Sequence, residues 1–235
     1  MKRLVIFLLV ALIPMMALPQ DPISRPGKKP VPAPASKPKP KPKPKPKPQP
    51  KPSKPTTGSH NGYEWVDLGL SVKWATCNVG ANSPSDYGDY YAWGETSTKS
   101  SYTEENSSTF GKSMGNIGGN SSYDVARYRW GGSWRLPTKA EFQELIDKCT
   151  WTWTTQGGHN GYKVTGKNGK SIFRPAAGWR YGTSPYYVGE YGYYWSSTPD
   201  ESNTYYAYYL YFNSSYHLVD WLYRNSGRSV RPVVE

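Results

Sequence analysis

The chain has 235 residues, of which 29 are Lys or Arg and 17 are Asp or Glu, so its formal net charge is +12. An excess of this size in a folded domain would favour a nucleic-acid partner. Residues 21–60 hold eleven of the basic side chains and one acidic side chain, whereas residues 61–235 hold sixteen of each sign. The positive charge therefore belongs to the N-terminal part of the chain, and we expect no nucleic-acid partner for the rest.

Residues 1–20 predict a secretory signal peptide. Lys2 and Arg3 precede an apolar run that extends from Leu4 to Leu18, which has the length of a signal h-region and is short for a membrane span. No Cys lies near the end of this run to carry a lipid anchor. We therefore expect an exported protein, located at the cell surface, in the periplasm or outside the cell. An uncleaved N-terminal anchor is the alternative.

Residues 21–60 predict a linker rich in Lys and Pro. The pair Lys-Pro is repeated six times between Lys37 and Pro48. Proline restricts φ and pushes the preceding residue toward extended backbone, so we expect polyproline II geometry. The segment lacks apolar residues that could form a core, which predicts a disordered stalk. Such a stalk serves as a solvated spacer, or as a spacer that also contacts anionic polymers of the cell envelope.

Residues 61–235 have the length of a single domain with unusual composition. Trp, Tyr and Phe make up 35 of these 175 residues, including all ten Trp and all 21 Tyr, while Leu, Ile and Val are scarce. We expect a core built from aromatic side chains whose polar tips need partners. One core of this size cannot bury every ring, so many tyrosines should face solvent.

Short strands separated by turns dominate the predicted elements of this domain. Gly166 to Gly169 has the sequence of a tight turn between two of them. In chain order, the predicted strands are 63–68, 71–76, 90–93, 162–165, 171–173, 193–197, 205–212, 217–222 and 229–233. In the longest, Tyr208, Leu210 and Phe212 should share one face, and Tyr209 and Tyr211 the other.

Two helices are predicted between the third and fourth strands. The first begins near Ser121, with Asp124 three residues later, and ends at Gly131. The second covers 138–149, where Thr138 and Glu141 have capping-box spacing and the apolar residues recur at helical intervals. The sequence therefore predicts an α+β domain, mostly antiparallel β, with two short helices and long loops.

Six segments, in order along the domain, resemble the Fibrobacter succinogenes major paralogous domain family. They are residues 66–81 (VDLGLSVKWATCNVGA), 87–95 (YGDYYAWGE), 130–138 (WGGSWRLPT), 173–178 (FRPAAG), 194–197 (YWSS) and 229–233 (SVRPV). The resemblance implies a C-type-lectin-like fold in an exported protein of Bacteroidetes-type bacteria. It brings no established enzymatic activity. It also implies that the last strands and their loops form the binding face.

The sequence lacks several common catalytic and metal-binding motifs. It has no Walker loop or His-Glu-x-x-His helix, and its His and Cys residues lack zinc-site spacing. We therefore expect no enzyme, no catalytic residue and no cofactor, with a glycosidase-like activity as the alternative. Asp86, Asp89 and Glu95 could offer oxygen ligands to calcium. Turn and cap chemistry is the favoured interpretation of these three, and we expect no metal site.

The C-terminal third predicts a ligand-binding site. Tyr and Trp lie there among Ser, Asn, Asp and Arg, a composition typical of binding surfaces and suited to sugar faces and hydroxyls. The predicted ligand-binding residues are Tyr186, Tyr187, Ser214, Tyr216, His217, Asp220, Trp221, Tyr223, Arg224 and Asn225. The alternative is that these rings belong to an aromatic core and strand ladder.

The predicted function is recognition of a glycan or a protein at the cell envelope or outside the cell. A structural envelope protein without a specific ligand is the alternative. Export to an oxidising compartment and the presence of two Cys in the domain also predict a disulfide between Cys77 and Cys149. Two buried free thiols are the alternative to that bond.

Overall fold

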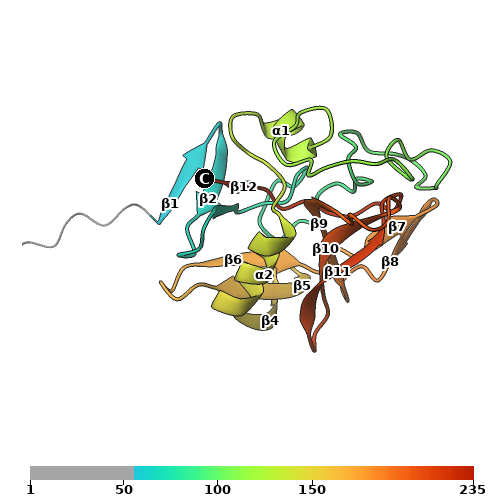
Figure 1. Ribbon diagram of the computed structural model, residues 1–235. Coiled ribbons are helices and arrows are strands. Elements are labelled where there is room, and N and C mark those ends of the chain that lie inside the picture. Colours follow the sequence, from blue (N-terminus) through green and yellow to red (C-terminus); the bar gives the residue numbers. More distant parts are fainter. Residues whose placement is uncertain (1–55) are drawn as a thin grey trace, which may run out of the picture. The chain divides into compact units, whose positions relative to one another are not determined.

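The computed structural model of the chain describes residues 56–235 (Figure 1). The predicted signal peptide and residues 21–55 of the predicted linker lie outside the described residues. Four antiparallel sheets and two short helices form the described part, so the prediction of a β-rich α+β domain is confirmed. None of the helices within residues 56–235 is long and apolar enough to cross a membrane.

The sheets are assembled from short strands. One has the order β1-β2-β3-β12, with β1 Thr57–His60, β2 Tyr63–Val66, β3 Lys73–Ala75 and β12 Val233–Val234. A second has the order β4-β5-β6, with β4 Thr150–Gln156, β5 His159–Thr165 and β6 Ser171–Pro175. The strands β7 Trp179–Tyr181 and β8 Ser184–Tyr186 form a separate two-stranded hairpin. The last sheet has the order β11-β10-β9, with β9 Gly192–Pro199, β10 Tyr206–Phe212 and β11 His217–Tyr223.

Both predicted helices are present and begin at capping side chains. Helix α2 (Lys139–Lys148) follows Thr138, whose hydroxyl accepts a hydrogen bond from the Glu141 N–H at 3.2 Å, while the Glu141 carboxylate accepts from the Thr138 N–H at 2.8 Å. The predicted capping box is therefore confirmed. Helix α1 (Val125–Trp130) is shorter than the predicted segment 121–130, because Asp124 is its N-cap.

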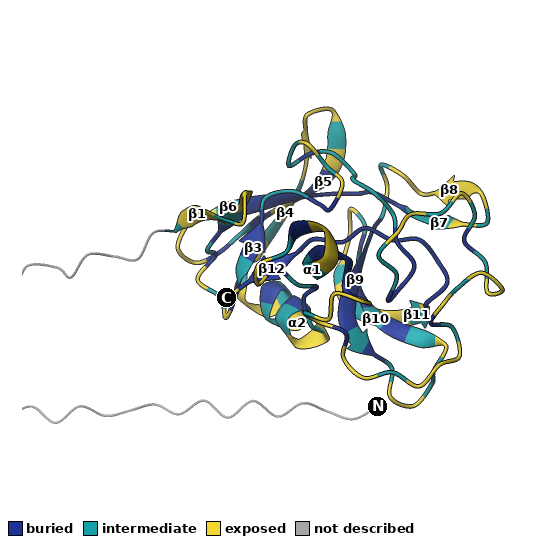
Figure 2. Cartoon of the chain, turned by 90° about the horizontal axis from the view of Figure 1, so that it is seen from above, coloured by how far each residue is buried: buried dark blue, intermediate teal, exposed yellow. Residues whose placement is uncertain are grey.

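The β9-β10-β11 sheet separates two cores, and its central strand is buried on both faces (Figure 2). Side chains alternate along a strand, so Tyr209 of β10 packs into one core, while Leu210 and Phe212 pack into the other. The two faces predicted for this strand are confirmed. Helix α2 covers the second core, where the rings of Phe142 and Trp74 lie 5.7 Å apart.

Four arginines within residues 56–235 are fully buried, and none of them forms an ion pair there. They are Arg174, Arg224, Arg228 and Arg231. The Arg174 guanidinium lies 4.5 Å from the Tyr194 ring centroid and has no hydrogen-bond partner in the described part. Burial lowers the pKa of Arg174 to about 9. Aromatic faces stabilise such cations in place of carboxylates.

The folded part begins before the predicted boundary at Asn61. The sequence places residues 57–60 in the linker, but they form β1 and pair with β2 in register. His60 ties this strand to the domain, because its Nε2 accepts from the Ser133 N–H at 2.8 Å and its carbonyl accepts from Trp134 Nε1 at 2.8 Å. These contacts are made by polar side chains and by the backbone. The predicted boundary rests on the lack of apolar residues before Asn61, so it does not take such contacts into account.

Several strands differ from the prediction. Residues 90–93 form no strand and contribute an isolated bridge between Tyr91 and Arg228, and only the end of segment 229–233 is extended, in β12. β4 has a clear Trp-Thr alternation that predicts a half-buried strand and was not assigned. The strands β7 and β8 have three residues each, too few for a periodic pattern.

Cys77 and Cys149 are free thiols, so the predicted disulfide is wrong. Cys149 follows α2 and packs against the second core. Cys77 follows β3 and lines a surface hollow together with Tyr63 and Trp130. The two thiols therefore lie in different environments, one against the second core and the other beside a surface hollow.

Alkylation of Cys149 tests this arrangement. Burial, with a smaller contribution from Glu144, raises the pKa of the Cys149 thiol from its ordinary value of 9.0 to about 11. Because only the thiolate reacts, folded Cys149 should alkylate about a hundredfold more slowly at pH 8 than the unfolded protein, and the rate should rise with pH. When the unreduced protein is unfolded and then alkylated, its intact mass should show two modified thiols. If the unreduced, unfolded protein shows no modified thiol, Cys77 and Cys149 form a disulfide after all.

Candidate ligand-binding surface

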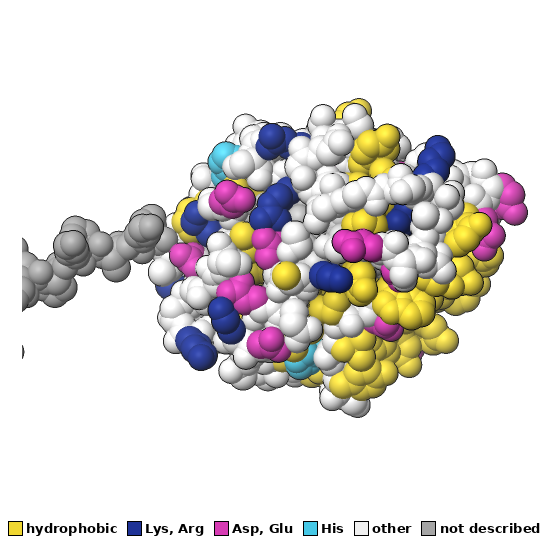
Figure 3. Space-filling model, in the orientation of Figure 1, with side chains coloured by type: hydrophobic (Ala, Val, Ile, Leu, Met, Phe, Trp, Pro, Cys, Tyr) yellow, Lys and Arg dark blue, Asp and Glu magenta, His cyan; other side chains and the backbone are white. Residues whose placement is uncertain are grey.

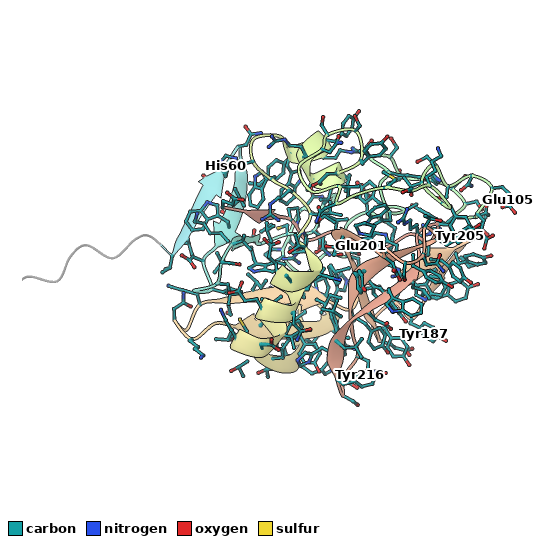
Figure 4. All side chains as sticks on the ribbon, viewed as in Figure 1. His60, Glu105, Tyr187, Glu201, Tyr205 and Tyr216 are labelled. Atoms are coloured by element: carbon teal, nitrogen blue, oxygen red, sulfur yellow. The ribbon has the colours of Figure 1, made fainter. Side chains whose placement is uncertain are left out.

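The hairpin β7–β8 and one face of the β9-β10-β11 sheet carry an extensive exposed aromatic surface (Figure 3). Tyr187 and Tyr216, each 50% exposed, lie at the end of the domain opposite His60 (Figure 4). Exposed apolar patches of this kind are uncommon unless they bind something. The aromatic surface is defined here by Trp179, Tyr181, Tyr186, Tyr187, Tyr191, Tyr211, Tyr216 and Leu222.

Ring contacts join the residues of the aromatic surface to one another. The centroids are 4.6 Å apart for Tyr187–Tyr191, 5.8 Å for Tyr191–Tyr211, 5.5 Å for Tyr211–Tyr216 and 5.3 Å for Trp179–Tyr186. Tyr193 joins these two groups of rings, at 6.1 Å from Trp179 and 5.2 Å from Tyr211. Tilted, stacked and edge-on arrangements of this type fix the orientation of each ring, so the surface is ordered before any ligand arrives.

Strand register places these side chains on one face. Tyr211 of β10 pairs with Leu218 of β11, and Ala207 pairs with Leu222, so all four project to the same side of the sheet. Tyr187 follows β8 with a φ of 54°, a left-handed conformation that is uncommon for a bulky side chain. Strain of this kind is often retained at binding sites.

A pocket of about 240 Å³ opens at the edge of the aromatic surface. It is lined by Glu104, Trp179, Tyr181, Leu222, Tyr223, Asn225 and Ser226. Glu104 is held beside the hairpin because Tyr102 and Gly182 exchange backbone hydrogen bonds of 2.9 Å. Larger hollows exist, including one of about 520 Å³ beside α2, but that one is lined mainly by the polar face of the helix. Aromatic walls with a few polar groups are the common form of a ligand pocket.

Two tyrosine hydroxyls of this sheet, those of Tyr209 and Tyr211, are neutral at physiological pH. Burial raises the pKa of Tyr209 to about 12, and burial together with the neighbouring Tyr216 hydroxyl raises that of Tyr211 to about 12. Both residues therefore present a ring face and an uncharged hydroxyl.

Arg228 supports the aromatic surface from below. Its guanidinium carbon lies 3.9 Å from the Tyr209 ring centroid, 4.1 Å from that of Trp195 and 5.6 Å from that of Tyr193. Tyr193 in turn contacts Trp179, at 6.1 Å between centroids. Burial lowers the pKa of Arg228 to about 10, which leaves it charged at neutral pH. A buried cation thus fixes the rings on which the exposed ones rest.

The structure brings together only part of the predicted binding residues. Tyr186, Tyr187 and Tyr216 belong to the aromatic surface, and Asp220 projects to the same face of β11. Ser214 is exposed in the turn between β10 and β11. Tyr223 lines the pocket at its rim, although its ring packs against that of Tyr206 at 4.8 Å.

Strand register places three predicted residues, His217, Trp221 and Tyr223, on the opposite face of the sheet. Trp221 pairs with Tyr208 and packs on Tyr206 at 4.9 Å, with 45% of its surface exposed. His217 is half-buried and stacks on Trp151 at 4.4 Å. Burial lowers the pKa of His217. The period of two along β11 separates these side chains from Asp220 and Leu222, which adjacency in sequence does not reveal.

Arg224 and Asn225 are buried rather than exposed on a loop. The Arg224 guanidinium lies 4.4 Å from the Trp93 ring and donates to the carbonyls of Tyr206 at 2.9 Å and Lys112 at 2.8 Å. It satisfies backbone carbonyls by hydrogen bonding in the core, so the prediction of a surface role for Arg224 is wrong. Asn225 is 2% exposed, yet it lines the pocket.

Sequence reasoning missed several residues of the site. Trp179, Tyr181, Tyr191 and Tyr211 come from the Tyr-rich stretch that drew attention to this region, but no pattern distinguished them from core rings. Glu104 lies in a loop far earlier in the chain, and nothing in its sequence neighbourhood indicates the pocket.

The acidic residues considered for calcium have other partners. The Asp86 carboxylate accepts from the Ser83 N–H at 2.8 Å and from the Ser83 hydroxyl at 2.8 Å, which lowers its pKa. Glu95 pairs with Lys99 at 2.7 Å. Asp89 accepts from the Tyr91 hydroxyl at 3.1 Å. Among residues 56–235, no group of His, Cys, Asp and Glu has the arrangement of a metal site.

Comparison with known proteins yields one family. No curated protein and no solved structure matches the chain. Residues 153–233, about a third of the chain, match a family described as a domain of unknown function, DUF8237. The matched segment begins within β4 and ends in β12, so the part of the chain that is similar to DUF8237 includes the hairpin and the sheet that carry the aromatic surface.

Proposed function

We propose that this chain is an exported recognition module that binds a glycan or a protein through its aromatic surface, without catalysis. The observation that carries the proposal is the continuous exposed aromatic surface beside a pocket that contains a carboxylate. Flat rings that carry hydroxyls suit the faces of sugars and the side chains of proteins alike. A buried cation and ring contacts hold the surface in place, so binding would cost little ordering of side chains.

The rest of the proposal comes from the sequence. The signal-peptide pattern supports export, and the Lys-Pro segment would act as a stalk that distances the module from the cell envelope or contacts its anionic polymers. The resemblance to the Fibrobacter succinogenes major paralogous domain supports a C-type-lectin-like fold. Relatives of that fold bind through their last strands, and the aromatic surface lies on β7 to β11.

A glycan array and a pull-down from envelope extract test the proposal. The wild type is compared with a Tyr181→Ala/Tyr187→Ala double variant, which removes two exposed rings of the surface. Tyr128→Ala is the matched control, since Tyr128 is 58% exposed on α1 and outside the aromatic surface.

We expect a glycan or protein that the wild type and the Tyr128→Ala control retain and the double variant loses. If no ligand is found, or if the double variant retains it equally, the proposal fails. A structural envelope protein without a specific ligand then becomes the better account.

A further inference from the structure

Carboxylates lie in and beside the aromatic surface. Glu104 is the one charged residue that lines the pocket. Residues 176–223 contain a single basic residue, Arg180, and four acidic residues, Glu190, Asp200, Glu201 and Asp220. The Arg180 guanidinium is engaged, because it donates to the Thr183 carbonyl at 2.9 Å and lies 5.9 Å from the Tyr90 ring. A positively charged ligand therefore meets the carboxylate of Glu104 in the pocket and that of Asp220 on the same face of β11.

Rings and carboxylates together recognise lysine and proline. Aromatic faces attract an ammonium group, and aromatic-lined grooves bind the preformed polyproline II helix of Pro-rich segments. Trp179 and Tyr181 supply rings to the pocket wall, while Glu104 supplies the carboxylate. The ligand chemistry that fits both features is an extended segment in which lysine and proline alternate.

The chain itself contains such a segment. Residues 37–48 are six consecutive Lys-Pro pairs. A polyproline II helix has about three residues per turn, so a two-residue repeat presents lysine and proline alternately along each edge. Any edge can therefore place a proline ring on an aromatic face and an ammonium group beside a carboxylate, and the six pairs provide several equivalent registers.

We propose that the aromatic surface binds residues 37–48 of a second copy of this chain. The domain begins at β1, which lies at the opposite end from the hairpin β7–β8 in both views (Figures 1 and 2). Only eight residues, 49–56, separate Pro48 from β1, and eight residues span at most about 29 Å, whereas the segment of a neighbouring copy is not limited by that distance. Such head-to-tail contacts join copies into rings or chains. The inference rests on the proposed function, because it uses the same surface.

Sedimentation of residues 21–235, the form that signal cleavage would leave, tests the inference. The average mass should rise with concentration, and a synthetic (Lys-Pro)6 peptide should reverse the rise. In a fluorescence titration, Tyr181→Ala should weaken peptide binding about tenfold and Glu104→Gln about threefold, with Tyr128→Ala as the unaffected control. A (Glu-Pro)6 peptide tests the charge, and a (Lys-Ala)6 peptide tests the need for proline.

A monomer at every concentration, absence of (Lys-Pro)6 binding, or equal binding of (Lys-Ala)6 would each overturn the inference. Equal affinity of Tyr181→Ala and wild type for (Lys-Pro)6 would do so as well. The two proposals remain distinguishable. If an array or extract ligand depends on Tyr181 and Tyr187 while (Lys-Pro)6 does not bind, the proposed function stands and the self-association fails.

Discussion

Replacing Arg231 with Ala should lower the free energy of unfolding by about 3–5 kcal/mol and the Tm by roughly 10 °C or more. Arg231 is fully buried, and its guanidinium donates to Asn78 Oδ1 at 2.7 Å, to the Ala75 carbonyl at 3.1 Å and to the Phe173 carbonyl at 3.0 Å. It also donates to the Thr76 carbonyl. The side chain thus joins β3, the loop after it and β6, and its loss leaves several buried acceptors unsatisfied.

Two control variants separate the hydrogen bonds of Arg231 from its charge and from the effect of removing an exposed arginine. Arg231→Lys keeps the charge but cannot donate in all these directions, so it should also lose most of the stability. Arg129→Ala, at an exposed position of α1, should change stability by no more than about 0.5 kcal/mol. Thermal melts of the three variants measure the effect. A Tm of Arg231→Ala within about 2 °C of the wild type would show that water replaces the guanidinium without cost.

Replacing Asp124 with Ala should be nearly as damaging, at about 3–5 kcal/mol. The buried Asp124 carboxylate accepts from four backbone N–H groups, two at the start of α1 and two outside the helix. The outside donors are Gly119 at 2.7 Å and Leu136 at 2.9 Å. Removing the carboxylate leaves all four donors without an acceptor, so a helix cap and two loops lose their anchor together.

Asp124→Asn separates the cap from the other contacts. Asparagine is as good an N-cap as aspartate, but its NH2 group would face the Gly119 and Leu136 donors, so we expect a loss of about 2 kcal/mol. Thr138→Ala, which removes the cap of α2, should cost about 1 kcal/mol. Denaturant unfolding gives the three values. Equal losses for Asp124→Ala and Thr138→Ala would mean that Asp124 acts as a helix cap alone.

Local signals in the sequence predicted much of the fold. The capping box of α2 involves residues three apart, and the two faces of β10 follow from alternation within seven residues, so neither depends on distant contacts. β1 was missed because a distant residue, Ser133, satisfies His60. The position of Cys77 likewise depends on how β3 joins its sheet. These features are set by pairing over long sequence separations, which a single sequence does not display.

The segments that resemble the paralogous domain family form the framework of the domain. Their large residues are almost completely buried, among them Trp74, Trp93, Trp134, Arg174, Tyr194 and Arg231. They therefore predict how the chain folds and not what it binds. Arg224 and Asn225 were misplaced for a related reason, because a stretch rich in Asn, Ser and Gly is typical of surface loops. The burial of Arg224 depends on Trp93, a ring from a distant segment.

Substitutions can decide which face of the β9-β10-β11 sheet binds the ligand. Trp221 is one of the predicted binding residues, but it lies opposite the aromatic surface. If that surface is the site, Trp221→Ala should leave affinity unchanged. If Trp221 is the anchor, Trp221→Ala should abolish binding and Tyr181→Ala should not.

The most direct test of the ligand site is affinity and Tm measured together for Tyr181→Ala and Tyr187→Ala, with the ligand from the array or the extract. Both rings are about half exposed, at 47% and 50%, so truncation should leave the Tm within about 2 °C of the wild type. We predict that each variant raises the Kd about tenfold or more, while Tyr128→Ala and Trp221→Ala bind as the wild type does. Unchanged affinity in both Tyr181→Ala and Tyr187→Ala, at an unchanged Tm, would contradict the account.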